Sequence, residues 1–146
     1  MIVLLRELFE NKSDVMYVNY IKEQMIQLYS QLSTCEMLPS NIFLWIIRSQ
    51  NIFVDIDEQL TIRGAITALL EKKVIHKGGI VCHIEDLVVH KDHRGQQIGS
   101  ELVDHVVNYA KEKGCYKTIL NCNEQVEPFY QKLGFQSKNK EMSIYF

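Results

Sequence analysis

The chain has 146 residues, 47% of them hydrophobic, with 16 lysines and arginines against 18 aspartates and glutamates and a formal charge of −2. This length and apolar content predict one domain, residues 1–146, with a single core. The balanced charge argues against nucleic-acid binding, and no apolar run approaches the roughly 20 residues that span a bilayer. Four cysteines without paired spacing favour a reducing cytoplasm over a disulfide scaffold.

The first third of the chain predicts a strand followed by two helices. Residues Ile2 to Phe9 favour a strand, and Ser13 or Asp14 is expected to cap the next helix. From Val18 to Leu32, apolar side chains recur at three- and four-residue steps, which predicts an amphipathic helix of about five turns. Ser40 is expected to cap a second helix.

Three strands are expected in the middle of the chain. Residues Asn51 to Ile56 alternate weakly and predict the first of them. Residues Leu60 to His76 are rich in β-branched side chains, so we assign a strand there, although Ala65 to Lys73 also has helical propensity. The residues from Lys77 to Gly79 favour a tight turn, which predicts a hairpin with a further strand from Ile80 to His90.

The last third of the chain predicts alternating helices and strands. Residues Ser100 to Lys113 show the clearest helical pattern, and Gly114 is expected to end that helix. Residues Tyr116 to Asn121 predict a short strand, Val126 to Leu133 a short helix, and Met142 to Phe146 a terminal strand. Antiparallel strands followed by strand-helix-strand units predict a mixed sheet with helices on its faces.

Two acidic residues interrupt the apolar strand that begins at Ile80. Strict alternation would point Asp86 to one face of the sheet and Glu85 to the other. An ionised carboxylate without a partner is costly in such a strand. Each acid is therefore expected to form a salt bridge, to lie at an opening in the sheet or to meet a polar ligand.

The turn from Arg94 to Gly99 joins this strand to the clearest helix. Glycines at a strand-to-helix turn let backbone N–H groups approach an anion, and the helix dipole favours negative charge there. The pattern predicts a phosphate or pyrophosphate site, with an ordinary tight turn as the alternative. The three-glycine dinucleotide fingerprint and the P-loop are both absent from the sequence.

These segments, together with residues Phe129 to Phe135, resemble the GNAT superfamily of acetyl-CoA-dependent N-acetyltransferases, whose pyrophosphate-binding pattern is Q/R-x-x-G/A-x-G/A. The resemblance implies an α+β fold, with a mixed central β-sheet flanked by helices and a splay between the fourth and fifth strands. Further segments are similar to the eukaryotic glucosamine 6-phosphate N-acetyltransferases, namely residues 32–34, 73–76, 83–86, 114–117 and 141–144.

The resemblance implies acetyl transfer from acetyl-CoA to an amine. A backbone N–H near Leu87 would polarise the thioester, and Tyr130 would protonate or hydrogen-bond the leaving thiolate. No metal is expected, because the histidines and cysteines form no set with tetrahedral spacing. The residues that match the coenzyme site are Leu87, Val88, Val89, Arg94, Gly95, Gln96, Gln97, Ile98, Gly99 and Ser100.

The same resemblance implies an acceptor site for a phosphorylated amino sugar. In addition to Tyr130, the catalytic candidates are Glu85, Asp86 and Asn121. The two acids would bind the hydroxyls and the amine of the sugar directly or through water. Lys117 is our first choice for the phosphate contact. The residues that match sugar-binding positions are Ser33, Lys73, His76, Glu85, Asp86, Tyr116 and Lys117.

Three positions depart from the family pattern. Gln97 stands where the pattern has Gly or Ala, so its side chain either weakens coenzyme binding or points outward. Asn121 occupies a position where some relatives have an aspartate near the reacting amine. Tyr145 occupies a position where some relatives have an arginine that reaches the sugar phosphate.

We therefore expect a cytoplasmic homodimer that acetylates glucosamine 6-phosphate, a step toward UDP-N-acetylglucosamine. The dimer is expected because the family packs its C-terminal strands against the partner, and Ile144 to Phe146 would otherwise be an exposed edge. One alternative is an acetyltransferase for another amine, which Asn121 and Tyr145 favour. A second alternative, favoured by Gln97, is a non-catalytic acetyl-CoA-binding sensor or interaction module.

Overall fold

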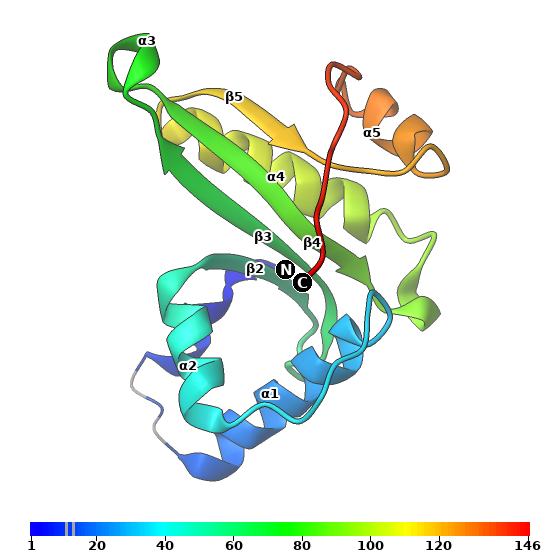
Figure 1. Cartoon of the computed structure of the whole chain (residues 1–146). Coiled ribbons are helices and arrows are strands. Elements are labelled where there is room, and N and C mark those ends of the chain that lie inside the picture. The colour runs from blue at the N-terminus through cyan, green and yellow to red at the C-terminus, as the bar shows by residue number, and fades with distance from the viewer. Residues whose placement is uncertain (11, 13) are drawn as a thin grey trace.

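The computed structural model describes residues 1–10, 12 and 14–146, and its centre is a five-stranded sheet (Figure 1). The strands lie in the sheet in the order in which they occur in the chain. The first four run antiparallel to their neighbours and the fifth is parallel to the fourth, which confirms the predicted mixed sheet. The strands are β1 Ile2–Leu4, β2 Asn51–Ile56, β3 Ile62–Lys72, β4 Ile80–Val89 and β5 Cys115–Leu120.

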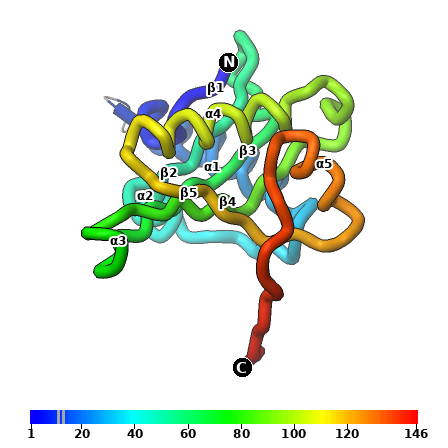
Figure 2. Tube along the Cα trace, turned by 90° about the horizontal axis from the view of Figure 1, so that it is seen from above, coloured from blue at the N-terminus to red at the C-terminus, as the bar shows by residue number. Residues whose placement is uncertain are grey.

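Helices cover both faces of this sheet (Figures 1 and 2). Helices α1 (Val15–Tyr29) and α2 (Ser40–Ser49) pack on one face, and their apolar side chains form a core with β2 and β3. Helix α4 (Ile98–Glu112) packs on the other face, where it forms a second core with β3 and β4 that α5 (Glu127–Lys132) extends. The single core expected from the sequence is therefore divided into two by the sheet.

The predicted first strand is wrong beyond Leu4. Only Ile2–Leu4 pairs with β2, and the chain continues as a 3-10 helix, η1 (Leu5–Phe9). Leu5 is fully buried in the first core. An apolar run this short fits a strand or a tight helical turn equally well, so periodicity could not separate the two.

Helix α1 begins and ends close to its predicted limits. Its N-cap is Asp14, whose carboxylate accepts a hydrogen bond from the Met16 N–H at 3.0 Å. Ser13, the alternative cap, lies outside the described residues. The helix ends at Tyr29, before Leu32, whose side chain is 48% exposed.

Ser40 does not cap α2, contrary to the prediction. The N-cap is Pro39, and Ser40 is the first helical residue. The Ser40 hydroxyl accepts a hydrogen bond from Lys22 Nζ at 2.9 Å, which ties α2 to α1. This tertiary contact satisfies the buried Lys22 ammonium and removes the serine from its local capping role.

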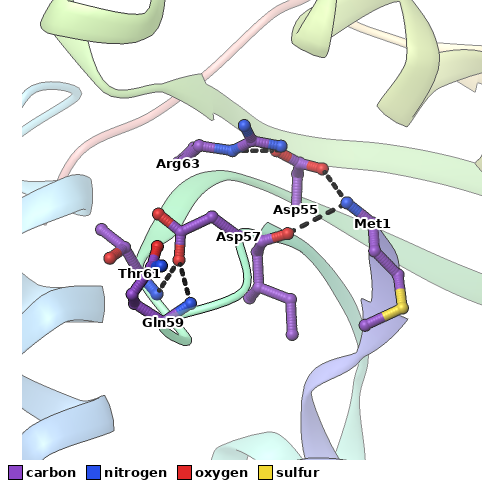
Figure 3. Close-up of polar contacts among 7 residues, drawn as sticks. Met1, Asp55, Asp57, Gln59, Thr61 and Arg63 are labelled. Carbon is purple, nitrogen blue, oxygen red and sulfur yellow. Dashed lines mark hydrogen bonds and ion pairs between the residues drawn. The ribbon is translucent and has the colours of Figure 1, made fainter.

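A buried charge fastens the N-terminus to β2 (Figure 3). The Asp55 side chain is 2% exposed, and its carboxylate lies 3.0 Å from the Met1 α-amino group and 2.7 Å from Arg63 Nη2. Two positive groups thus compensate a carboxylate whose burial alone would be costly.

The two hairpin turns are more elaborate than simple two-residue turns. Between β2 and β3, the Asp57 carboxylate accepts hydrogen bonds from the N–H groups of Thr61 and Gln59 (Figure 3), and these bonds lower its pKa. The predicted β3–β4 hairpin is confirmed. Its tip, labelled α3 (Ile75–Gly78), is a turn in which His76, Lys77 and Gly78 have left-handed φ values of 53°, 56° and 78°, and it begins before the tight turn expected at Lys77 to Gly79.

The C-terminal half contains the predicted elements up to α5, but no terminal strand. Helix α4 begins at Ile98, two residues before the predicted start at Ser100, and the preceding loop contains a 3-10 turn, η2 (Lys91–His93). Residues 135–146 have no regular structure and end in a tail that projects from the body (Figure 2). Residues Met142 to Phe146 are therefore extended and exposed instead of forming a strand. No described helix is both long and apolar enough to cross a membrane.

Candidate active site

Strands β4 and β5 separate halfway along β4. Their parallel pairing runs from Ile80 opposite Cys115 to Ile84 opposite Leu120 and ends there. The next five residues of β4, Glu85 to Val89, have no partner on β5. The splay expected between the fourth and fifth strands is confirmed, and it opens the sheet edge to ligands.

A β-bulge in β4 lies at the mouth of this splay. Val88 pairs with Ala65 and Glu85 with Thr67, so two β4 residues oppose a single residue of β3. Asp86, in the bulge, has a left-handed φ of 52°. The predicted strict alternation is therefore wrong beyond Glu85: residues before the bulge and after it have exchanged faces, and Val88 packs with α1 rather than α4.

The two acids of β4 stand at this opening. Asp86 is exposed and Glu85 is half-buried, and neither forms a salt bridge within the described part of the chain. Beneath them, burial raises the pKa of the Tyr29 phenol to about 12, and the Asp86 carboxylate acts in the same direction. Of the three expectations for these acids, the structure shows exposure at an opening and leaves both carboxylates available to a polar ligand.

A cleft of about 560 Å³ follows the unpaired end of β4 and crosses to the start of α4. It brings together nine of the ten residues predicted for the coenzyme site and leaves out Gln96, which is exposed beside it. Its other lining residues, Leu32, His93, Val126 and Phe129, come from the α1–α2 connection, η2 and the α5 region. The lining residues from the predicted set are Leu87, Val88, Val89, Arg94, Gly95, Gln97, Ile98, Gly99 and Ser100.

The turn before α4 presents free backbone donors to this cleft. Gly95 and Gln97 have left-handed φ values of 78° and 64°. Among the described residues, the N–H groups of Gly95, Gln96 and Gln97 find no hydrogen-bond acceptor. The amides in the first turn of α4 also lack intrahelical acceptors, and the helix dipole adds positive potential there. This arrangement fits a diphosphate.

Arg94 lies at the entrance of the turn with its guanidinium held in place. Its Nε donates to the Val89 carbonyl at 3.3 Å, and its Nη2 donates to Gln31 Oε1 at the same distance. The guanidinium therefore adds a fixed positive charge to the cleft wall.

Tyr130 lies on α5 next to Phe129, which lines the cleft, and is not itself among the lining residues. Its ring packs edge-on against Phe129 and Phe135, with centroid distances of 5.0 and 5.9 Å. Burial raises the pKa of the Tyr130 phenol, and the Cys122 thiol adds to this effect. The phenol therefore stays protonated at neutral pH, as a proton donor must.

The predicted acceptor residues occupy the half of the sheet that α1 and α2 leave open. In the registers, Glu71, His83, Glu85 and Lys117 share one face of β3, β4 and β5. Glu71 links two of the neighbouring groups: its Oε1 lies 2.5 Å from Lys73 Nζ, and its Oε2 lies 2.8 Å from His83 Nε2. The Lys73 side chain hydrogen bond is the main reason that the pKa of Glu71 is lowered.

The remaining acceptor candidates are spread over three places. His76, at the tip of the β3–β4 hairpin, has a left-handed φ of 53°, and its ring packs against Tyr116 with 4.6 Å between centroids and a tilt of 41°. Asn121 directly follows the last paired residue of β5, at the splay. Ser33 is exposed just past α1. The structure thus brings Glu85, Asp86 and Asn121 to the splay, while His76 and Tyr116 lie at the far end of β4.

Sequence reasoning missed two polar residues at this site. Gln31, just past the end of α1, accepts a hydrogen bond from Arg94 in the turn from Arg94 to Gly99, which we call the coenzyme turn. Glu71 forms ion pairs with Lys73 and His83. Neither belongs to a local motif, and Gln31 is 63 residues from Arg94 in the sequence, so only the fold reveals the contact. The described residues contain no group of three or more potential metal ligands among His, Cys, Asp and Glu.

The chain is similar to known acetyltransferases over most of its length. The model of the acetyltransferase (GNAT) family matches residues 17–135. A rice protein named probable glucosamine 6-phosphate N-acetyltransferase 2 is 34% identical over 131 residues, which cover 83% of this chain and 79% of that protein. Rice glucosamine 6-phosphate N-acetyltransferase 1 is 42% identical over 88 residues, 60% of this chain and 52% of its own length. The chain therefore spans about half the length of that relative.

Solved structures show the same architecture. The crystal structure of glucosamine-6-phosphate N-acetyltransferase from Arabidopsis thaliana superposes with a TM-score of 0.81 and 31% identity, covering 88% of this chain and 93% of that one. An acetyltransferase of Trypanosoma brucei superposes with a TM-score of 0.80 and 29% identity, covering 86% and 92%.

Proposed function

Because the chain belongs to the acetyltransferase (GNAT) family, we propose that it is a glucosamine 6-phosphate N-acetyltransferase with acetyl-CoA as its co-substrate. The observation that carries the proposal is the turn from Gly95 to Gln97, whose N–H groups have no hydrogen-bond acceptor among the described residues and whose Gly95 and Gln97 line a cleft beside the splayed strands. The names of relatives that are 34% and 42% identical support the choice of acceptor.

The proposed coenzyme site fits the cleft. The amides of the turn and of the first turn of α4 would bind the diphosphate, with Arg94 beside them. The pantetheine arm would then run along the unpaired edge of β4 toward Glu85. The N–H of Leu87, which lines the cleft, would donate to the thioester oxygen as negative charge develops there.

The chemistry is direct transfer. The neutral amine of the sugar attacks the thioester carbonyl carbon, so a C–N bond forms and the C–S bond breaks. The amine loses one proton and the departing thiolate gains one, and Tyr130 would donate to the sulfur. A sugar amine is partly neutral near pH 7, so no strong base is required; Glu85, Asp86 and Asn121 would orient it.

The ion pairs of the open sheet face support Lys117 as the phosphate contact. Lys73 is engaged by Glu71, whereas Lys117 forms no salt bridge among the described residues and lies near the Tyr116 ring, 5.7 Å from its centroid. His76, at the hairpin tip, and Tyr116, on β5, pack against each other and would border the phosphate rather than the reacting amine. Ser33 would approach the sugar from the α1 side.

The proposal includes a homodimer in the cytosol, acting on the path to UDP-N-acetylglucosamine. Its C-terminal tail exposes apolar side chains at Met142 and Ile144, which are 94% and 81% exposed, and a second chain would cover them. Four free thiols favour a reducing compartment. One domain over residues 1–146 remains our assignment.

A different amine acceptor is the second candidate. Asn121 and Tyr145 replace two residues that some glucosamine 6-phosphate enzymes carry, and both lie at or beyond the proposed acceptor site. A non-catalytic acetyl-CoA-binding module is the third candidate, because Gln97 holds a left-handed backbone where the family pattern has Gly or Ala.

A panel of acceptors separates these candidates. Purified protein is mixed with acetyl-CoA and, separately, glucosamine 6-phosphate, glucosamine, spermidine, an aminoglycoside or a lysine peptide, and free CoA is measured. We expect release with glucosamine 6-phosphate at least tenfold faster than with the other amines. If CoA is released only with another amine, that amine and not glucosamine 6-phosphate is the acceptor. Coenzyme binding without turnover on any amine would favour the non-catalytic module.

A further inference from the structure

We infer that Gln31, just past the end of α1, is a positioning residue that holds the coenzyme turn in its binding shape. The inference rests on the proposed function only in taking acetyl-CoA as the ligand of the cleft. Gln31 belongs to neither the cleft lining nor the family pattern. It reaches the turn from another layer of the molecule, across the end of β4.

The Gln31 side-chain oxygen accepts two hydrogen bonds from residues of η2 and the coenzyme turn. The backbone N–H of Lys91, in η2, donates to Oε1 at 2.9 Å. Arg94 Nη2 donates to the same oxygen at 3.3 Å. An amide oxygen has two lone pairs, so this acceptor is fully used. Gln31 therefore fixes one backbone group and one charged side chain at the start of the turn.

The other half of the amide sets its orientation. Gln31 Nε2 donates to the Leu28 carbonyl at 3.2 Å, within the last turn of α1. This bond turns the oxygen toward η2 and the coenzyme turn. Helix α1 is anchored by side chains in the first core, such as Leu28, which is 1% exposed. The two hydrogen bonds that Gln31 accepts therefore connect η2 and the coenzyme turn to a rigid helix rather than to another loop.

The consequence concerns Arg94. Its guanidinium is held at Nε by the Val89 carbonyl and at Nη2 by Gln31, which leaves the two N–H groups of Nη1 and one N–H of Nη2 as donors for an anion in the cleft. Without Gln31, the guanidinium keeps one anchor and regains rotational freedom. Binding the diphosphate would then have to restrict Arg94 and the turn, so affinity for the coenzyme falls.

Gln24, within α1, provides a matched control, and Gln31 itself lies two residues past the end of α1 at Tyr29. Gln24 also bridges to a distant segment: its Nε2 donates to the Leu60 carbonyl at 3.2 Å, and its Oε1 accepts from the Ile62 N–H at 2.9 Å. Its two partners, Leu60 and Ile62, belong to the β2–β3 turn and to β3, and neither is a residue of the turn before α4. Gln24→Met therefore removes an equivalent pair of bonds without touching Arg94 or Lys91.

The test measures the dissociation constant of CoA by calorimetry for the full chain and three variants. We expect Gln31→Met to raise Kd about tenfold, because a bond to a charged group and a backbone bond are lost. Gln31→Glu keeps an acceptor for both donors but loses the bond to the Leu28 carbonyl and adds a negative charge beside the diphosphate, so its Kd should rise as well. The Kd of Gln24→Met for CoA should stay within about twofold of that of the unmodified chain. Both Gln31→Met and Gln24→Met are expected to lower the melting temperature.

Kinetics supply a second readout. Gln31→Met should raise the KM for acetyl-CoA and leave kcat at saturating coenzyme and the KM for the acceptor within about twofold. Hydrogen exchange can be measured on the unmodified chain. CoA should slow exchange of the Lys91 amide, because coenzyme binding to the turn and the hydrogen bond from Lys91 to Gln31 stabilise each other.

The outcomes distinguish this inference from the proposed function. If the unmodified chain binds CoA and Gln31→Met binds it equally well, or as well as Gln24→Met does, the positioning role is wrong while the function stands. If Gln31→Met fails to fold, unchanged exchange of the Lys91 amide on CoA binding would equally show that the positioning role is wrong. If the unmodified chain binds no CoA, the proposed function is wrong, and the role of Gln31 falls with it.

Discussion

Tyr130 is the residue at which catalysis and coenzyme binding can best be separated. Its phenol is the proposed donor to the departing sulfur, and burial keeps it protonated by raising its pKa above the ordinary value of 10.0. We expect Tyr130→Phe to lower kcat by about 10²-fold, in the range of general acid catalysis. Phe keeps the packing against Phe129 and Phe135, so the Kd for CoA should stay within about twofold.

Steady-state rates and calorimetry on the same preparation check this prediction. The raised pKa also means that ionisation of Tyr130 should cause no loss of rate below pH 10. An unchanged kcat, measured where acetyl transfer limits the rate, would remove Tyr130 from the mechanism.

Gln97 tests whether a side chain is tolerated in the coenzyme turn. Its φ of 64° is a conformation that costs non-glycine residues roughly 1–2 kcal/mol, and its side chain lines the cleft. We expect Gln97→Gly to bind CoA more tightly and to melt no lower than the unmodified chain. Gln96→Gly is the control, because Gln96 lies outside the cleft lining and has no positive φ. Weaker CoA binding by Gln97→Gly would mean that the glutamine contributes to the site.

For individual residues, the sequence predicted what is local and missed what is distant. The turn from Arg94 to Gly99 carries its signal in adjacent residues, so the family resemblance named nine of the thirteen residues that line the cleft and missed the other four. Gln31 could not, since its partners are 60 and 63 residues away. Ser40 illustrates the converse error: a good local cap was diverted by a contact with Lys22.

Among the elements, β1 depends on a charge that sequence patterns do not reveal. Asp55 joins the Met1 α-amino group and Arg63 at a position that is 2% exposed. We expect Asp55→Ala to lower the free energy of unfolding by about 1–3 kcal/mol, because its hydrogen bonds are lost while water can solvate the Met1 and Arg63 groups, which are 73% and 26% exposed. Asp55→Asn keeps one acceptor oxygen, enough for one of the two donors, and should cost less.

Denaturant unfolding of both variants checks the Asp55 prediction. If Asp55→Ala unfolds at the same denaturant concentration as the unmodified chain, the ion pairs contribute nothing to stability. If the free energy of unfolding falls as much in Asp55→Asn as in Asp55→Ala, the stabilisation comes from the charge of Asp55 alone.

The bulge in β4 shows where element-level prediction reached its limit. Hydrophobic alternation identified the strand and its bounds within one residue, but the extra residue at Asp86 exchanges the faces that follow it. No sequence signal marks it, since aspartate is only one of several residues that adopt a left-handed φ. The predicted strand from Ile2 to Phe9 failed for a related reason, because a short apolar run does not specify its period.

For the whole molecule, the C-terminal tail is the segment that the single chain leaves unexplained. The apolar pattern from Met142 to Phe146 predicted a strand, yet within the described chain these residues pair with nothing. A strand requires a partner edge as well as a pattern, and the proposed second chain would supply one. The overall architecture was otherwise predictable, because strand order and helix placement follow from short connections.

Removing the tail tests the proposed dimer. We expect the full chain to sediment as a dimer at micromolar concentration and a chain ending at Gln136 to sediment as a monomer. Tyr145→Ser in the full chain, which removes one apolar side chain of the tail, should weaken the dimer without abolishing folding. A full chain with the mass of one copy, 17.1 kDa, would contradict the dimer.

The proposed function depends above all on free backbone amides at the splay that bind the coenzyme diphosphate. An NMR titration of the ¹⁵N-labelled chain with CoA observes these amides themselves. We expect the amide resonances of Gly95, Gln96, Gln97, Ile98 and Gly99 to shift most strongly, and those of His76 and Lys77, at the hairpin tip, to stay in place. Saturating CoA that leaves the resonances from Gly95 to Gly99 unshifted, or that shifts another region instead, would contradict diphosphate binding at this turn.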